Sequence, residues 1–328
     1  MASLFCCIIF FLLAFISLIL LYLVINQMML FLSQNKFINS KPNLLKKYYL
    51  ASLHCHSYYD GELTVKDIVL KAYKNKYSIF SITDHLEPKL FIDPSLPFKY
   101  LKELIKKGKT LSNLSLKLIN NHTIKVYNKK ISNSHVLYLI QGVEISAIDK
   151  NKKTHLGIIG LDKMPKPYQT LDYYLKKYKK ENVLVTACHP FSPNKQGMGL
   201  SNLKKYKENI DLIELNGSFP LPFGYFINNK TKKVAKNLAV PVISNTDAHT
   251  KSNYFNTFSL LIPKSKDFDE NNIIRYIKKY STSTKTVMCY PPILKTYLWI
   301  FKGLFFKKKV PKEFKIKRKK IKNLFRAI

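Results

Sequence analysis

The sequence predicts an α/β fold in which about seven strands close into a barrel, preceded by a transmembrane helix. The first observation is that short apolar segments alternate with amphipathic segments through residues 47–262. The second is that residues 4–32 contain no charged side chain. Alternation at this density is typical of parallel strands joined by helices, and about seven repeats favour a closed sheet over an open one.

The individual elements follow from the spacing of apolar residues and from cap and turn signals. Strands are expected near residues 48–54, 78–83, 136–144, 155–161, 183–188, 211–215 and 240–245. Helices are expected near residues 64–76, 98–108, 168–180, 201–207, 229–238 and 269–280. Thr64 and Asp67 form a good start for the first of these helices. Residues 109–135 lack clean periodicity, and we expect an insertion or a loosely structured connection there.

Residues 4–32 are long enough to cross a bilayer, because a helix of about 20 apolar residues spans its hydrocarbon core. A cleaved signal peptide is the alternative, but it has a basic start, a shorter apolar core and a small-residue cleavage site. We therefore favour an uncleaved anchor over residues 1–35. The lysines that follow the run are Lys36, Lys41, Lys46 and Lys47. Since positive charge beside a span tends to stay cytoplasmic, a single-pass protein with a cytoplasmic body is expected.

The formal net charge of +35 has two readings. One is attraction to nucleic acid or to anionic lipid, and the other is a general bias toward lysine in the chain. Only three of the 55 basic residues are arginine, on which base reading and bidentate phosphate binding mainly depend. Nucleic-acid binding therefore stays open but is not favoured. The lysine-rich, aromatic tail over residues 286–328 is equally compatible with a membrane contact and with a solvated tail.

Six of the eight histidines fall at the ends of expected strands, and acidic residues fall in similar places. Residues two apart in a strand face the same side, as His54 and His56 do, and Asp247 and His249 repeat this spacing. Active sites of parallel α/β barrels are assembled at strand ends, so these side chains are expected to meet. A lone histidine there would more often be a packed or capping residue, but six with matching acids favour a metal centre. His122 and His135 fit no such pattern and are expected to be surface residues.

Six short motifs occur in a fixed order over about residues 50–250: "HCHSYYDG", "ITDH", "GVE", "HLG", "CHP" and "TDAH". This ordered set resembles the PHP family, the polymerase and histidinol phosphatase superfamily of metal-dependent phosphoesterases. The resemblance implies a distorted seven-stranded β/α barrel over residues 45–285. The anchor at residues 1–35 would precede this domain, and the basic tail at residues 286–328 would follow it.

The resemblance also implies nine ligands for two or three divalent metal ions. One ion would be held by His54, His56, Glu144 and Asp247. Glu144 would bridge to a second ion, whose other ligands would be His155 and His189. A third ion would be held by Asp60, His85 and His249, although "HSYYDG" is one residue shorter than the usual family spacing. Of these ligands, Glu144, His189 and Asp247 are expected to be catalytic, and Asp84 is expected to support its neighbour His85.

Imidazole and carboxylate ligands together suit zinc, manganese or iron. Clustered divalent ions turn bound water into a hydroxide nucleophile and neutralise charge on a phosphate ester, so no serine or cysteine nucleophile is needed. The sequence has no GxSxG motif and no glycine-rich phosphate loop, and its ten glycines disfavour a dinucleotide-binding fold.

The leading expectation is a membrane-anchored enzyme that hydrolyses a phosphomonoester or phosphodiester with a metal-bound hydroxide. A 3′–5′ exonuclease or nucleotide phosphatase, both known in the family, is an alternative. A non-enzymatic, membrane-tethered binding module is another, although the full set of ligands argues against it. The loop at residues 216–226 carries aromatic side chains that are expected to pack more readily than to stack on a substrate ring.

Overall fold

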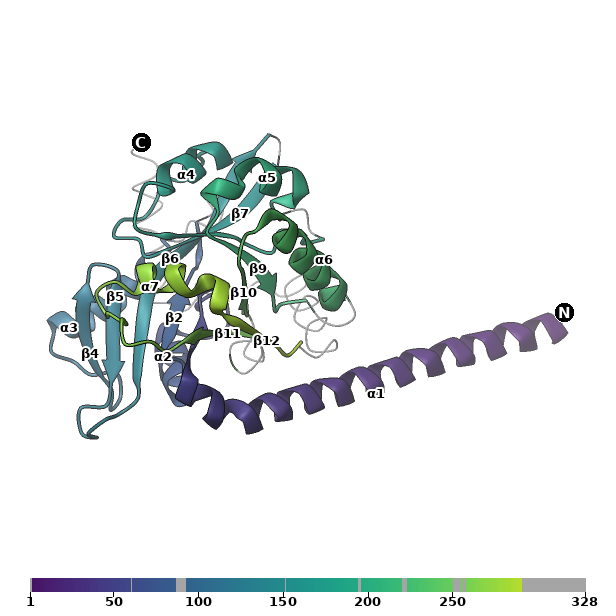
Figure 1. Cartoon of the computed structure of the whole chain (residues 1–328). Helices are drawn as coiled ribbons and strands as arrows, with labels where there is room; N and C mark the ends of the chain where they lie inside the picture. The colour runs from purple at the N-terminus through teal and green to yellow at the C-terminus, as the bar shows by residue number, and fades with distance from the viewer. Residues whose placement is uncertain are drawn as a thin grey trace, which may run out of the picture.

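The computed structural model describes residues 2–59, 61–86, 93–150, 152–193, 196–219, 223–249, 255 and 258–290. The predicted ligand Asp60 and the predicted tail from residue 291 onward lie outside these residues. Figure 1 shows a curved sheet with helices on its outside and one long helix that leaves the body.

Nine strands form one continuous path through the sheet. In sheet order they are β10 (Val242–Asn245), β9 (Leu212–Asn216), β8 (Leu184–Ala187), β7 (Lys152–Ile159), β6 (Val136–Asp149), β2 (Ile79–Ile82), β1 (Tyr48–Ser52), β11 (Phe258–Pro263) and β12 (Lys285–Met288). Off this path lie β3 (His85–Leu86), β4 (Ser115–Asn120) and β5 (Thr123–Tyr127). The seven expected strands are all present, but seven is too few, because the described residues form twelve strands.

The sheet is mixed, whereas the sequence predicted parallel strands. β8, β9 and β10 are parallel to one another, and so are β1, β2 and β6, but β7 runs antiparallel to both of its neighbours. The register that pairs Asp149 with Lys152 leaves only a tight turn between β6 and β7, with Lys150 at a φ of 54°. A parallel crossover needs about a dozen residues, so this short link makes a hairpin.

The two ends of the strand path approach each other, which makes the sheet a nearly closed barrel. The Ser244 hydroxyl on β10 donates to the Ser259 carbonyl on β11. Just beyond the strands, the Leu53 N–H donates to Oδ1 of Asn245 at 2.8 Å. The barrel-like closure expected from the repeat count is therefore confirmed, and it brings the ends of β1 and β10 side by side.

Residues 109–135 were expected to be an insertion or a loosely structured connection, and the structure contradicts only the second alternative. Residues 115–127 form the hairpin of β4 and β5, and β5 pairs antiparallel with β6. The alternation is visible in β5, where Ile124 and Val126 are buried and Lys125 between them is less so. β4 lies outside β5 and buries none of its residues, which removes the apolar signal from half of the segment.

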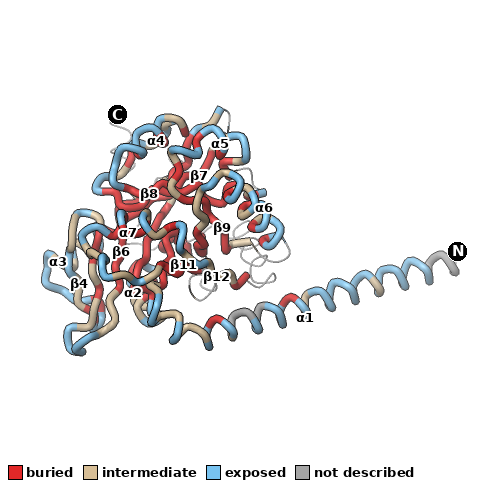
Figure 2. Tube along the Cα trace, viewed as in Figure 1, coloured by how far each residue is buried: buried red, intermediate tan, exposed pale blue. Residues whose placement is uncertain are grey.

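All six expected helices are present, with two short 3₁₀ turns at Lys207–Asn209 and Ser281–Ser283. They are α2 (Val65–Lys74), α3 (Leu96–Lys106), α4 (Leu171–Tyr178), α5 (Gly199–Tyr206), α6 (Phe223–Leu238) and α7 (Ile273–Tyr280). The Thr64 hydroxyl accepts from the Asp67 N–H at 3.1 Å, so the predicted helix start is confirmed. Figure 2 shows the strands buried and the outer faces of the helices exposed.

Three large apolar clusters hold the barrel and its helices together, and two of them pack α2, α3 and α4 against the sheet. One includes Ile68 of α2, Leu101 of α3 and Phe80 of β2, and the other includes Tyr174 of α4 and Val185 of β8. Burying each large apolar side chain contributes roughly 1.5–3 kcal/mol. The strand ends are therefore carried by a well-packed scaffold, which can hold polar side chains in place.

The long helix α1 (Ala2–Lys47) includes one stretch, Cys6–Met29, that is long and apolar enough to cross a membrane. Its mean hydropathy is 3.2 and Asn26 is its only buried residue, although a signal sequence near an N-terminus also passes this test of length and composition. The other end of α1 belongs to the body, because Phe37 is buried and Leu44 and Leu45 pack against the apolar core.

Candidate metal centre

The predicted ligands lie at one rim of the barrel. The strands β1, β2, β6, β8, β9 and β10 all run in the same direction, so their carboxyl ends share this rim. The structure brings together every predicted ligand that it describes: His54, His56, His85, Glu144, His155, His189, Asp247 and His249. Asp60 is not among the described residues.

The Glu144 carboxylate is fully buried at the centre of this cluster. Its Oε2 atom lies 3.1 Å from His54 Nε2, 3.3 Å from His56 Nε2 and 3.1 Å from His85 Nδ1. Its Oε1 atom lies 2.7 Å from His155 Nδ1 and 2.9 Å from His189 Nε2. The two oxygens therefore face two separate groups of imidazoles.

Gly142 allows β6 to bring Glu144 to this position. A Cβ atom at Gly142 would lie 2.6 Å from the Ser81 hydroxyl and 2.8 Å from a methyl carbon of Thr83. Any other residue would push β6 away from β2, where Ile82 pairs with Gln141. The glycine of the "GVE" motif is thus explained by a close approach of two strands.

Asp247 completes the group around Oε2 of Glu144. Its Oδ1 atom lies 3.1 Å from His56 Nε2 and 3.5 Å from His54 Nε2. The ring of His249 stacks on the ring of His56 with a centroid distance of 4.0 Å, and its Nδ1 lies 3.6 Å from Oδ1 of Asp247. One ligand atom from each of His54, His56, Glu144 and Asp247 lies within 4.8 Å of the others.

Two of the cluster residues have strained backbones. His189 has a φ of 26° and Asp247 a φ of 45°, in the left-handed region that residues other than glycine seldom adopt. The His189 N–H donates to Oε2 of Glu214 at 3.0 Å, and the Asp247 N–H donates to the His54 carbonyl at 3.1 Å. Strain of this kind costs about 1–3 kcal/mol per residue and clusters at functional sites.

The donor set fits a divalent cation. His54 Nε2 and His56 Nε2 lie 3.1 Å apart, and both also face carboxylate oxygens. Neutral imidazoles cannot point lone pairs at each other and at a carboxylate unless a proton or a cation lies between them. Three further sets have ligand atoms equally close together: His56, His85 and His249; His85, Glu144 and His155; and His54, Cys188 and Glu214. Imidazole and carboxylate donors are those expected for zinc, manganese or iron.

The electrostatics of the cluster favour anionic carboxylates. Burial alone raises the pKa of Glu144, but the imidazoles of His85, His155 and His54 outweigh it and hold that pKa well below its usual range. Burial likewise opposes ionisation of Asp247, yet His54, His56 and His249 keep its pKa well below the ordinary value. Both carboxyl groups are therefore ready to bind a cation at neutral pH.

Glu214 on β9 is a site residue that the sequence reasoning missed. Its carboxylate is fully buried, and its Oε1 lies 2.8 Å from Nδ1 of His54. This contact fixes the His54 tautomer with its proton on Nδ1, so that Nε2 presents a lone pair to the cluster. The available signal was a single acid inside the apolar strand "LIELN", because a charged residue is seldom fully buried without a partner.

Asn216 and Ser218, which follow Glu214 along the chain, also escaped prediction. The Asn216 amide donates to Oδ2 of Asp247 at 2.8 Å, and the Ser218 hydroxyl donates to the same atom at 3.2 Å. These bonds leave Oδ1 of Asp247 directed at the histidines. Asp84, expected to support His85, accepts from the Ser57 N–H and hydroxyl at 2.6 Å each, which anchors the segment after His56.

The two remaining histidines lie outside the cluster, as expected, but each is only half exposed. Nδ1 of His122 lies 2.8 Å from Oδ1 of Asp162, and His135 Nε2 lies 2.7 Å from the Tyr77 carbonyl. Neither has a second acidic or imidazole neighbour among the described contacts. They serve as reference residues for the histidines of the cluster.

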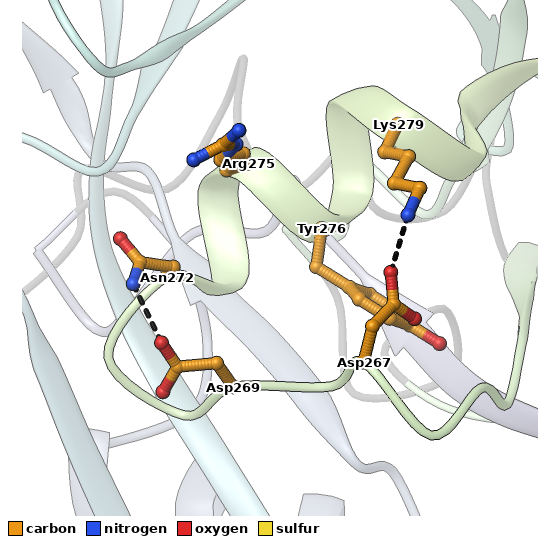
Figure 3. A pocket seen from close by; sticks show the side chains of 6 residues that line it. All are labelled: Asp267, Asp269, Asn272, Arg275, Tyr276 and Lys279. Atoms are coloured by element: carbon orange, nitrogen blue, oxygen red, sulfur yellow. Dashed lines mark hydrogen bonds and ion pairs between the residues drawn. The ribbon is translucent and has the colours of Figure 1, made fainter.

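A surface hollow of about 350 Å³ beside α7 is a second place where charged groups gather, as Figure 3 shows. Asp267 pairs with Lys279 at 2.5 Å, and Asp269 accepts from the Asn272 amide at 2.6 Å. The acids in this hollow are already engaged by neighbours on α7 or the turn before it. We therefore do not regard it as the functional site.

No family model and no curated protein sequence matches the chain. The fold resembles the crystal structure of PsfC from Pseudomonas syringae PB-5123, with a TM-score of 0.52 and 14% identity. That match covers 77% of this chain and 97% of PsfC. At this identity the likeness shows a shared fold.

Two further solved structures match with lower TM-scores. One is a two-domain protein from Bacteroides vulgatus containing a predicted PHP-like metal-dependent phosphoesterase, with a TM-score of 0.48, 16% identity, and coverage of 74% of this chain and 65% of that chain. The other is an amidohydrolase from Chromobacterium violaceum with bound sulfate and no metal, with a TM-score of 0.41, 12% identity, and coverage of 63% and 89%.

Proposed function

We propose that this protein is a membrane-anchored, metal-dependent hydrolase of the PHP family that cleaves phosphate monoesters or diesters. The observation that carries the proposal is the buried Glu144 carboxylate, whose two oxygens lie 2.7–3.3 Å from five imidazole nitrogens. The ordered motifs of the sequence support the same assignment. The name of the Bacteroides vulgatus protein refers to the same activity.

Two or three divalent ions, zinc, manganese or iron, would be held by this cluster. One would take His54, His56, Glu144 and Asp247, and the second would take Glu144, His155 and His189. The third would take His85, His249 and Asp60. Such ions supply a water-derived nucleophile at neutral pH and neutralise charge on a phosphate ester. The chain holds these ligands in place through Glu214 and Asn216.

The test uses the full-length protein, purified in detergent, stripped with a chelator and reloaded with zinc, manganese or iron. It is offered a chromogenic phosphate monoester, a phosphate diester and an amide. Metal-dependent cleavage of a phosphate ester, absent in Glu144→Ala and retained in His122→Ala, is the expected result. Cleavage of the amide alone would overturn the phosphoesterase assignment.

Two other outcomes belong to the alternative functions. Progressive shortening of a labelled oligonucleotide from its 3′ end would identify the exonuclease. Full metal loading with turnover of none of these substrates would identify a non-enzymatic binding module.

We also propose that α1 anchors the protein in a membrane as an uncleaved span with the body in the cytoplasm. Supporting this, α1 continues from the apolar stretch into the body, where Phe37 is buried. A protein held by such a span resists alkaline carbonate extraction and keeps its N-terminal residues in an intact-mass measurement. Release by carbonate, or a mass that lacks the apolar stretch, would overturn the anchor. Protection of the body from protease added outside sealed cells tests the orientation.

A further inference from the structure

The first turn of α6 directs its three aromatic side chains outward, whereas Val234 and Leu238 farther along the helix pack against the apolar core. The buried residues of α6 are Gly224, Asn228, Thr231 and Ala235. Its exposed aromatics are Phe223 at 58%, Tyr225 at 51% and Phe226 at 66% exposure. A surface helix of a soluble domain normally does the reverse. The sequence-based expectation that these aromatics pack is therefore wrong, and their outward face suits an apolar partner.

The charge of α6 indicates what kind of partner this is. The helix has no acidic residue and four lysines: Lys230, Lys232, Lys233 and Lys236. Exposed aromatics beside lysines, without acids, are typical of helices that lie in the headgroup layer of a bilayer. Each lysine near an anionic leaflet strengthens such binding about fivefold.

The position of α6 relative to α1 points to the same bilayer. Phe37 is buried and Leu44 packs against the core, so this end of α1 has a fixed direction relative to the body. From Met29, where the apolar stretch ends, the helix continues to Lys47, roughly 27 Å at 1.5 Å per residue. The body lies beside this part, and α6 is on the side of the body that faces the N-terminal part of α1 (Figure 1).

We propose that the outward face of α6, formed by Phe223, Tyr225, Phe226, Lys230 and Lys233, rests on the anionic surface of the bilayer that α1 crosses. This inference rests on the proposed membrane anchoring. A phospholipid surface is preferred to a protein partner because the apolar stretch of α1 already fixes where the bilayer lies.

The contact would bring the metal centre close to the bilayer. α6 follows β9, whose carboxyl end lies at the rim that carries the cluster. Asn228 of α6 accepts from the Asn216 N–H at 3.0 Å and donates to its carbonyl at 2.9 Å. Asn216 in turn donates to Asp247 at 2.8 Å. A short hydrogen-bonded path therefore joins the proposed membrane face to a candidate metal ligand.

The experiment places single tryptophans in the full chain, after the native Trp299 is replaced by phenylalanine. Three variants are compared: Phe226→Trp on α6, Tyr173→Trp on the exposed face of α4 as a control, and Leu18→Trp in the apolar stretch. Each is reconstituted into vesicles of phosphatidylcholine and phosphatidylserine that contain lipid brominated on its acyl chains. Tryptophan fluorescence is quenched where the side chain reaches the acyl boundary.

Phe226→Trp is expected to be quenched at least about twofold more than Tyr173→Trp. Lys233→Gln added to Phe226→Trp should weaken the contact, and so should vesicles of phosphatidylcholine alone. Equal quenching of Phe226→Trp and Tyr173→Trp, with Leu18→Trp strongly quenched, would overturn the docking while the anchor stands. Failure to quench Leu18→Trp would overturn the anchor and the docking together. Quenching of Phe226→Trp that is the same in neutral vesicles would overturn the role of anionic lipid.

Discussion

The two oxygens of Glu144 face two differently built halves of the candidate metal centre. On the Oε2 side, a further layer of hydrogen bonds holds the ligands: Glu214 fixes the ring of His54, and Asn216 and Ser218 fix Asp247. Such outer contacts set the tautomer and the direction of a ligand before any ion arrives. The Oε2 half is therefore preorganised.

The Oε1 half has less support. His155 and His189 approach Oε1 closely, but their outer ring nitrogens, Nε2 of His155 and Nδ1 of His189, are buried without a hydrogen-bond partner in the described part of the chain. Glu214 holds the backbone of His189 and not its ring. We infer that the Oε2 half binds its ion more tightly, and that the Oε1 half loses its ion first when a chelator is added.

The largest effect is expected from Glu144→Ala, which removes the one carboxylate that both halves share. Several imidazoles would then face one another without a central anion, so ions should be lost from both halves. Hydrolysis should fall by at least about a thousandfold, since metal ions supply several kcal/mol of transition-state stabilisation. Elemental analysis and phosphate release measure the two effects.

His122→Ala is the matched control, because His122 pairs only with Asp162 at the surface. It should leave metal content and turnover unchanged. If Glu144→Ala kept the ions of either half, Glu144 would not be the shared ligand and the comparison would fail.

The pair His155→Ala and Asp247→Ala separates the two halves. His155 contacts Oε1 of Glu144, whereas Asp247 contacts the histidines on the Oε2 side. His155→Ala should lose about one ion per chain and keep the more tightly bound one, whereas Asp247→Ala should lose the tight ion. Metal content after dialysis against a weak chelator measures this. Equal losses in both variants would mean that the halves do not bind independently.

Glu214→Gln should have a smaller effect, confined to affinity. Glutamine keeps only one of the two oxygens, so it can accept from either the His189 N–H or His54 but not from both, and it removes the charge that orients the imidazole. Affinity for the ion on the Oε2 side should fall by about 10–100-fold. Chelator competition followed by metal analysis measures it, with Glu208→Gln at an exposed position as the control. An unchanged affinity would show that Glu214 has no part in metal binding.

Most candidate ligands of both halves were predictable because they sit in short motifs at or just beyond strand ends, although Glu144 and His155 lie inside β6 and β7. His54, His189 and Asp247 are of this kind, and closure of the barrel then brings them together.

Glu214 was not predictable in the same way, because "LIELN" has the apolar pattern of a buried strand and the partner of its acid lies 160 residues away. Glu214, Asn216 and Ser218 support only the Oε2 half, and this depends on contacts between segments far apart in the sequence, which local residue spacing does not predict.

The fold shows the same division between local and tertiary information. The seven core strands and six helices follow from apolar periodicity. The hairpin of β4 and β5 was missed because β4 buries no residue, and the antiparallel position of β7 depends on the short turn at Lys150. The sequence predicted that the strand from residue 136 ends at residue 144, whereas β6 continues to Asp149. The connection to β7 is therefore much shorter than predicted, and a short connection makes the next strand antiparallel.

The smallest effect is expected in the pH dependence of stability after metal removal. Burial disfavours the charged form of His54, but Glu214 and Glu144 outweigh it and hold the pKa of His54 well above its usual value of 6.5, and the pKa of His189 is also raised. A raised pKa contributes stability that is fully present below pH 6.5 and is lost as the pH rises through the folded-state value.

Chelated protein should therefore lose roughly 2–4 °C in Tm as the pH rises above 6.5. Metal-loaded protein should lose less, because the bound ion takes the place of the protons. Glu214→Gln should make the Tm of the chelated protein less dependent on pH, because it removes a charge that raises the pKa of His54. If the Tm did not change with pH either with or without chelator, protons would not replace the ions in the cluster. The raised pKa of His54 would then not contribute to stability, which would contradict this prediction.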